Sequence, residues 1–123
     1  MLYCSGSLGI DPRTGAFVAG DVVDRTVQSL RNLKQVLIAG GSDLSKVVKV
    51  TIFVSSMAHY AKVNEGYAKV FGAYDVKPCR TCVGVASLPL DAEVEFELVA
   101  TIWVIVVYEV EPCAKGWPKG HSV

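Results

Sequence analysis

The sequence predicts an α+β domain in which one mixed β-sheet carries two helices on one face. Two segments with helical periodicity alternate with strand-like segments, and turn signals stand near both ends, so the expected order is β-β-α-β-α-β-β. A length of 123 residues suits one domain. The apolar content of 51% exceeds what such a core needs, and a closed ring of subunits would cover the open face of the sheet.

The first elements are expected to form a hairpin. Residues Leu2–Leu8 alternate loosely and favour a strand. The turn is predicted over Asp11–Gly15, because Pro12 presets φ and Gly15 supplies a positive φ. A short strand over Ala16–Val18 would then return along the first one.

Helical spacing is clearest over Asp21–Ala39, where Asp21 and Asp24 lie near the positive end of the helix and Gly40 and Gly41 end it. The expected apolar stripe is Val23, Val27, Leu30, Leu33 and Leu37. A second helix is predicted over Met57–Phe71, with Ser55 or Ser56 as its cap. Its expected stripe is Met57, Tyr60, Ala61, Asn64, Tyr67 and Phe71.

Three more strands are expected. Residues Val47–Val54 are nearly continuously apolar, which predicts a strand buried on both faces. Pro78 leads into a strand over Cys79–Ala86, and Leu88–Asp91 makes a turn. From Glu93 onward the last strand places Val94, Phe96 and Leu98 on one face, with Glu95 and Glu97 on the other.

Composition argues against several classes of protein. Twelve basic and twelve acidic residues balance and form no basic block, so nucleic acid is not the expected partner. The apolar run Leu98–Tyr108 is too short to cross a membrane as a helix and is β-branched, so we expect no membrane anchor. No metal-ligand cluster, phosphate loop or dinucleotide loop stands out, so any chemistry is expected to need neither metal nor cofactor.

The Cys79-x-x-Cys82 pair suggests a redox or zinc motif. In a strand, however, positions i and i+3 point to opposite faces, and no helix follows that would lower a thiol pKa. We therefore interpret the pair as two ordinary cysteines, and all four cysteines of the chain as reduced thiols.

Three polar residues are candidates for a binding site, and each has a structural alternative. Arg80 precedes small side chains on one strand face, as at the mouth of a carboxylate-binding space; it could instead form a salt bridge with Glu95 or Glu97. Asn64 interrupts an apolar stripe and contacts either a ligand or backbone. Glu95 either holds a water molecule beside a cleft or belongs to a solvated face.

These residues stand in motifs that resemble the RidA (YjgF) family of imine deaminases. The resemblance covers about residues 2–102 and keeps motif order and spacing. Its parts are Tyr3–Gly9 followed by Asp11-Pro12-x-Thr14-Gly15, the segment KVNEGYAKVF with the preceding strand Val48–Val54, Pro78–Val83, Leu88-Pro89 and Val94–Glu97.

The resemblance implies a chorismate-mutase-like α+β barrel that is a homotrimer with sites between subunits. It implies hydrolysis of 2-iminobutanoate or 2-iminopropanoate to the 2-oxo acid and ammonia. By position, Arg80 matches the arginine that binds the substrate carboxylate and Glu95 the glutamate that positions water. Cys82 and Asn64 match cleft-lining residues, and Ser5-Gly6 matches the backbone that faces the imine. Relatives in cytosol and mitochondria make a cytoplasmic or mitochondrial location the expectation.

Two departures from the family pattern bear on domain organisation. Residues 1–102 are expected to form a RidA-like domain without the family's N-terminal strand, and residues 103–123 a C-terminal tail that the family lacks. Two other functions stay open: a non-catalytic module that binds small carboxylates, and RNA cleavage or translation inhibition.

Overall fold

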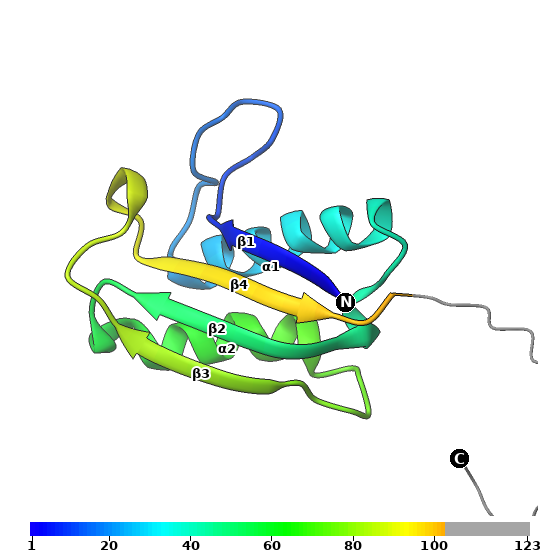
Figure 1. The fold of residues 1–123 in the computed structure, drawn as a ribbon. Helices are drawn as coiled ribbons and strands as arrows, with labels where there is room; N and C mark the ends of the chain where they lie inside the picture. The colour runs from blue at the N-terminus through cyan, green and yellow to red at the C-terminus, as the bar shows by residue number, and fades with distance from the viewer. Residues whose placement is uncertain (103–123) are drawn as a thin grey trace, which may run out of the picture.

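In a computed structural model, which describes residues 1–102, four strands form one mixed sheet with two helices on one of its faces (Figure 1). The elements are β1 (Leu2–Ser7), α1 (Val22–Ala39), β2 (Val47–Val54), α2 (Tyr60–Phe71), β3 (Cys79–Gly84) and β4 (Val94–Ala100). Short 3₁₀ turns cover Leu44–Lys46, Met57–His59 and Pro89–Asp91. The predicted fold class is confirmed.

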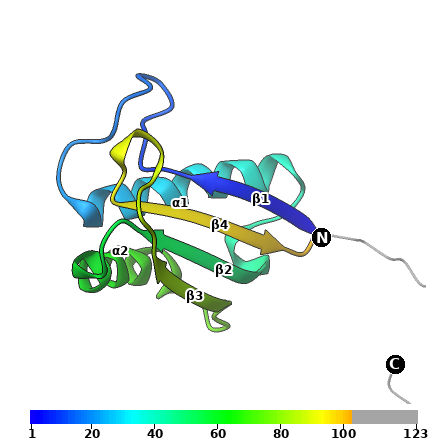
Figure 2. The same cartoon turned by 60° about the vertical axis from the view of Figure 1, so that its left-hand side comes forward.

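The strand order β1-β4-β2-β3 places the last strand second in the sheet. β4 runs antiparallel to both β1 and β2, whereas β2 and β3 are parallel and are connected through α2. After a turn of the view, both helices still lie behind the sheet, α1 behind β1 and β4, and α2 behind β2 and β3 (Figure 2). The opposite face of the sheet carries no helix within residues 1–102.

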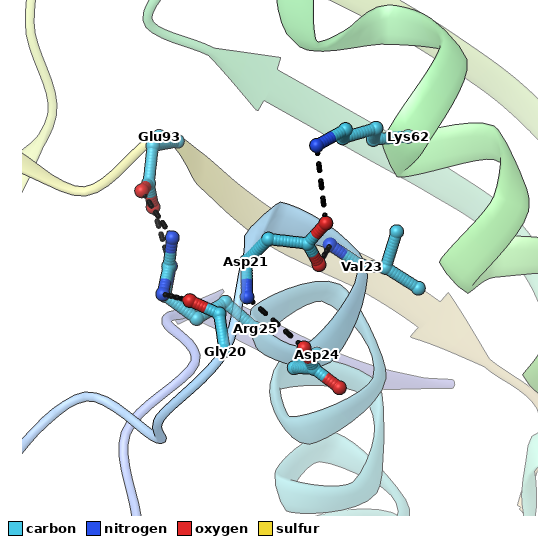
Figure 3. Close-up of polar contacts among 7 residues, drawn as sticks. All are labelled: Gly20, Asp21, Val23, Asp24, Arg25, Lys62 and Glu93. Atoms are coloured by element: carbon cyan, nitrogen blue, oxygen red, sulfur yellow. Dashed lines mark hydrogen bonds and ion pairs between the residues drawn. The ribbon is translucent and has the colours of Figure 1, made fainter.

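The start of α1 follows its sequence signals closely. Asp21 accepts a hydrogen bond from the Val23 amide at 2.9 Å, and Asp24 accepts one from the Asp21 amide at 3.0 Å, which completes a capping box. Lys62 of α2 donates to the Asp21 carboxylate at 3.1 Å (Figure 3). Arg25 forms two hydrogen bonds with the Glu93 carboxylate, at 2.7 and 2.5 Å, and thereby ties α1 to the start of β4.

The core lies between the helices and the sheet. Alternate residues of β2 and β4 face it, together with the apolar face of α1. Its largest fully buried side chains include Phe71, Phe96, Leu30, Leu37, Ile52 and Val50.

Three predictions about elements are wrong. Ala16–Val18 forms no regular strand: the chain does turn back, with one isolated bridge between Ile10 and Phe17 and backbone hydrogen bonds from Asp11 to Ala16 and from Val18 to Gly9, but the pairing extends no further. β2 is buried on one face only: Val50, Ile52 and Val54 are buried, whereas Lys49, Thr51 and Phe53 on the other face are partly exposed. The apolar run therefore does not mark burial on both faces in the single chain.

The third error is the buried face of α2. Val63, Gly66 and Phe71 are the buried positions, whereas Met57, Tyr60 and Ala61 are exposed. The helical face is thus rotated from the predicted stripe, because the close approach of α1 selects Gly66. The predicted continuation of the last strand over residues 103–108, and the tail to residue 123, lie outside the described residues.

Candidate active site

The β3 strand positions Arg80 under helix α2. Its register places Arg80 beside Val50, and alternation then directs the side chain to the face that the helices cover. The Arg80 Nη2 donates to Asn64 Oδ1 at 2.6 Å and to the Tyr60 hydroxyl at 3.4 Å. Its guanidinium carbon lies 4.9 Å from the Tyr67 ring centre and 5.8 Å from the Tyr60 ring centre.

Cys82 follows two residues later on the same strand face and packs partly against the core. Burial raises the pKa of the Cys82 thiol, and the positive charge of Arg80 only partly offsets this. The thiol is therefore a neutral lining group at physiological pH. We call Arg80, Asn64, Cys82, Tyr60 and Tyr67 the arginine half-site.

A second cluster forms where β1 pairs with β4. The β1 strand bulges between Cys4 and Ser7, which places Ser5 and Gly6 opposite the middle of β4. A side chain at Gly6 would collide with the Glu95 carboxylate: an added Cβ would overlap Oε1 and lie 2.6 Å from Cδ. Glycine thus admits the carboxylate against the backbone. We call Ser5, Gly6 and Glu95 the glutamate half-site.

The two half-sites do not meet within one chain. Glu95 pairs with Phe53, and Phe53 pairs with Val83, so Glu95 faces the side of the sheet opposite to Arg80. The alternative that Arg80 forms a salt bridge with Glu95 or Glu97 is also wrong, because β2 separates β3 from β4. Within residues 1–102, Arg80 forms hydrogen bonds to neutral groups and no ion pair.

The structure divides the six residues expected from the sequence into two groups of three: Arg80, Asn64 and Cys82, and Ser5, Gly6 and Glu95. Tyr60 and Tyr67, the ring partners of Arg80, were not among the expected site residues. Their signal was present, since they lie four residues before and three residues after Asn64, on one side of a helix. The two cysteines at positions 79 and 82 point to opposite faces, as their spacing predicted.

Within residues 1–102, no cluster of three or more histidine, cysteine or acidic side chains could hold a metal ion. The helices in the same range are all too short or too polar to cross a lipid bilayer. The polar groups of the half-sites are a guanidinium, an amide, a carboxylate and backbone groups, which suit a small polar ligand with a carboxylate.

The fold and these clusters define an α+β protein with the elements of a small-molecule site. A family model described as Endoribonuclease L-PSP matches residues 1–102, and the chain belongs to this family, which is the RidA family expected from its motifs.

Two named relatives and one solved structure illustrate the relationship. The chain is 45% identical over 102 residues to the chloroplastic Reactive Intermediate Deaminase A of Arabidopsis thaliana, covering 83% of this chain and 54% of that protein. It is 41% identical over 101 residues to the 2-iminobutanoate/2-iminopropanoate deaminase of Salmonella typhimurium, with 81% and 78% covered. The structure of a putative endoribonuclease from Thermotoga maritima matches with a TM-score of 0.76, 44% identity and 83% and 79% coverage.

Proposed function

We propose that this chain hydrolyses small 2-imino acids, such as 2-iminobutanoate and 2-iminopropanoate, to 2-oxo acids and ammonia. The observation that carries the proposal is the pair of half-sites: a guanidinium held by neutral partners, and a carboxylate seated against a glycine backbone. Relatives named as imine deaminases at 41–45% identity support it.

Arg80 would bind the carboxylate of the imino acid. Among residues 1–102 the hydrogen-bond partners of Arg80 are neutral, so no neighbouring carboxylate competes with a ligand for the guanidinium. Its planar fork matches a carboxylate with two parallel hydrogen bonds. The rings of Tyr60 and Tyr67 displace water from part of the surroundings of the cation, which strengthens its attraction for an anion.

Glu95 would handle the water. An imine carbon is already electrophilic, so orientation and electrostatics suffice for the reaction. In the proposed step, water adds its oxygen to the imine carbon while Glu95 accepts a proton from it, and that proton is passed to the nitrogen. The hydroxyl of the tetrahedral intermediate then gives its proton to the amino nitrogen. The C–N bond breaks, ammonia leaves, and the C–O bond becomes the C=O bond of the 2-oxo acid.

Because the half-sites lie on opposite faces of one sheet, the complete site would need a second copy of the chain. The open sheet face carries exposed apolar side chains that an interface would bury, among them Tyr3 at 75% and Val83 at 39% exposure. We propose a homotrimer in which the arginine half-site of one subunit meets the glutamate half-site of the next. A cytoplasmic or mitochondrial location belongs to the same proposal.

The test is a threonine dehydratase reaction in which semicarbazide traps the released imine. Adding this protein should lower the trapping signal by converting the imine first. Arg80→Ala should abolish the effect, and Arg80→Lys should weaken it about 10- to 100-fold, because a point charge cannot replace a bidentate fork. Lys62→Ala, which removes an exposed cation bonded to Asp21, is the matched control. An unchanged trapping signal with the folded, trimeric parent protein would reject imine hydrolysis.

Two other functions give different outcomes. A non-catalytic carboxylate binder would bind 2-oxobutanoate through Arg80 without any turnover. The description of the family as an endoribonuclease keeps RNA cleavage as the second candidate. That activity should show a steep dependence on salt, which the balanced charge of the chain argues against.

A further inference from the structure

The hydrogen bonds of Arg80 occupy the nitrogen that both carboxylate-binding edges of its guanidinium share. A guanidinium can offer a carboxylate two different pairs of hydrogens, one end-on and one side-on, and both pairs include a hydrogen of Nη2. In this structure Nη2 donates one hydrogen to Asn64 at 2.6 Å and the other to the Tyr60 hydroxyl at 3.4 Å. Both pairs are therefore engaged before any ligand arrives.

These two bonds differ in strength. The distance to Asn64 is short for an N–H···O bond, whereas the distance to Tyr60 is beyond the normal range of 2.7–3.2 Å. Tyr60 is also 40% exposed, so its hydroxyl can bond water when it loses Arg80. A carboxylate would displace the Tyr60 contact at little cost, while the Asn64 contact would remain.

The Tyr67 ring lies against the guanidinium of Arg80. Its ring stacks on Phe71, with centres 4.7 Å apart and an interplanar angle of 26°, and Phe71 is fully buried. The ring thus has a fixed place in the core, and Arg80 lies over it at 4.9 Å. Among residues 1–102 the Tyr67 hydroxyl finds no hydrogen-bond partner, so the contribution of Tyr67 comes from its ring.

We propose that Tyr67 and Tyr60 are positioning residues that set which pair of Arg80 hydrogens meets the substrate carboxylate. Tyr67 fixes the plane of the guanidinium, Asn64 keeps one Nη2 hydrogen, and Tyr60 holds the other until the ligand replaces it. The inference rests on the proposed function, because it assigns the ligand of Arg80 as the carboxylate of the imino acid. It adds two aromatic side chains that act through Arg80.

The experiment measures the affinity for 2-oxobutanoate by calorimetry and the KM and kcat for the imino acid, using the full chain. Tyr67→Leu should weaken binding and raise KM about 10-fold while kcat stays within about twofold, since orientation of the carboxylate clamp is lost. Tyr67→Phe, which keeps the ring, should restore parental affinity. Tyr60→Phe should bind 2-oxobutanoate at least as tightly as the parent, because a competing acceptor is gone.

The control is Tyr74→Leu, which removes another ring that contacts Phe71, at 6.1 Å, but not Arg80. Equal losses of affinity in Tyr67→Leu and Tyr74→Leu would show a general packing effect and overturn the inference. Parental affinity in Tyr67→Leu, or weak binding in Tyr67→Phe or Tyr60→Phe, would overturn it as well. If the parent binds 2-oxobutanoate but does not hydrolyse the imine, the proposed function fails while the affinities still decide the positioning role.

Discussion

Replacing Gly6 by alanine should separate the activity of this protein from its stability. A Cβ at Gly6 would lie 2.6 Å from Glu95 Cδ and 3.1 Å from Cγ, whereas carbon atoms normally approach to about 3.5–4.0 Å. The carboxylate must therefore move outward by about 1 Å. A displacement of about 1 Å in an active site costs on the order of 100-fold in rate.

The expected effect on stability is small. The colliding atoms belong to the end of a flexible side chain, so Glu95 can rotate at a cost of about 0.5–1.5 kcal/mol. Alanine also restricts the unfolded strand segment and is favoured over glycine there by about 0.5–1 kcal/mol. These contributions offset each other, and the free energy of unfolding should change by less than about 1 kcal/mol.

Imine turnover and urea unfolding of Gly6→Ala should be measured side by side with Gly84→Ala. An added Cβ at Gly84 would make only ordinary contacts, 3.6 Å from Met57 Cγ, so this control should keep both activity and stability. Turnover of Gly6→Ala within about threefold of the parent, together with an inactive Glu95→Ala, would refute the view that Gly6 admits the carboxylate. A fully active Glu95→Ala would instead refute the role of Glu95.

Three further predictions concern the packing and charges of α1. Thr26 is fully buried, and its hydroxyl has no hydrogen-bond partner in the part of the chain that the structure describes. Thr26→Val should therefore raise the free energy of unfolding by about 1 kcal/mol, measured in urea. At Gly66, an added Cβ would lie 2.8 Å from Thr26 and 2.9 Å from the Val23 carbonyl oxygen. The resulting overpacking costs about 1–3 kcal/mol, which exceeds the gain of about 1 kcal/mol in helix propensity, so Gly66→Ala should lower Tm by a few degrees. A higher Tm would contradict the close approach of the two helices. Burial opposes ionisation of Glu93, but hydrogen bonds from Arg25 keep its pKa below the ordinary value. The stabilisation from this ion pair is therefore complete above the pKa of about 4.3 that a glutamate has in the unfolded chain, and it disappears as pH falls through the lower pKa of the folded state. Arg25→Met should reduce the loss of stability between about pH 7 and pH 3. An unchanged loss would show that the Arg25–Glu93 pair does not cause it.

The local signals of the sequence predicted most elements well. Asp21 and Asp24 define the start of α1 because capping depends on residues three positions apart, and the observed helix begins at Val22. The alternation of Val94, Phe96 and Leu98 correctly gave the buried face of β4. The errors arose where burial depends on distant partners, as for Phe53, whose side chain lies on a sheet face that no helix within residues 1–102 covers.

Sequence motifs also identified the residues of the candidate site, but they did not predict which of these residues lie together. Neighbouring positions such as Ser5 and Gly6 share a half-site because the chain is continuous. By contrast, the separation of Arg80 from Glu95 follows from β2 lying between β3 and β4 and from the register of three strands. Which rings contact Arg80 depends on how α2 packs over β3, and the periodicity of the sequence does not specify that packing.

By itself, the sequence determined the α+β class, the positions of the two helices and the family, because capping, periodicity and motif spacing are properties of short stretches of chain. Only the tertiary structure decided which face of α2 is buried, that Arg80 lies against aromatic rings, and that the two halves of the site lie on opposite faces of the sheet. The physical reason is that strand order and helix packing are fixed by contacts between residues far apart in the chain.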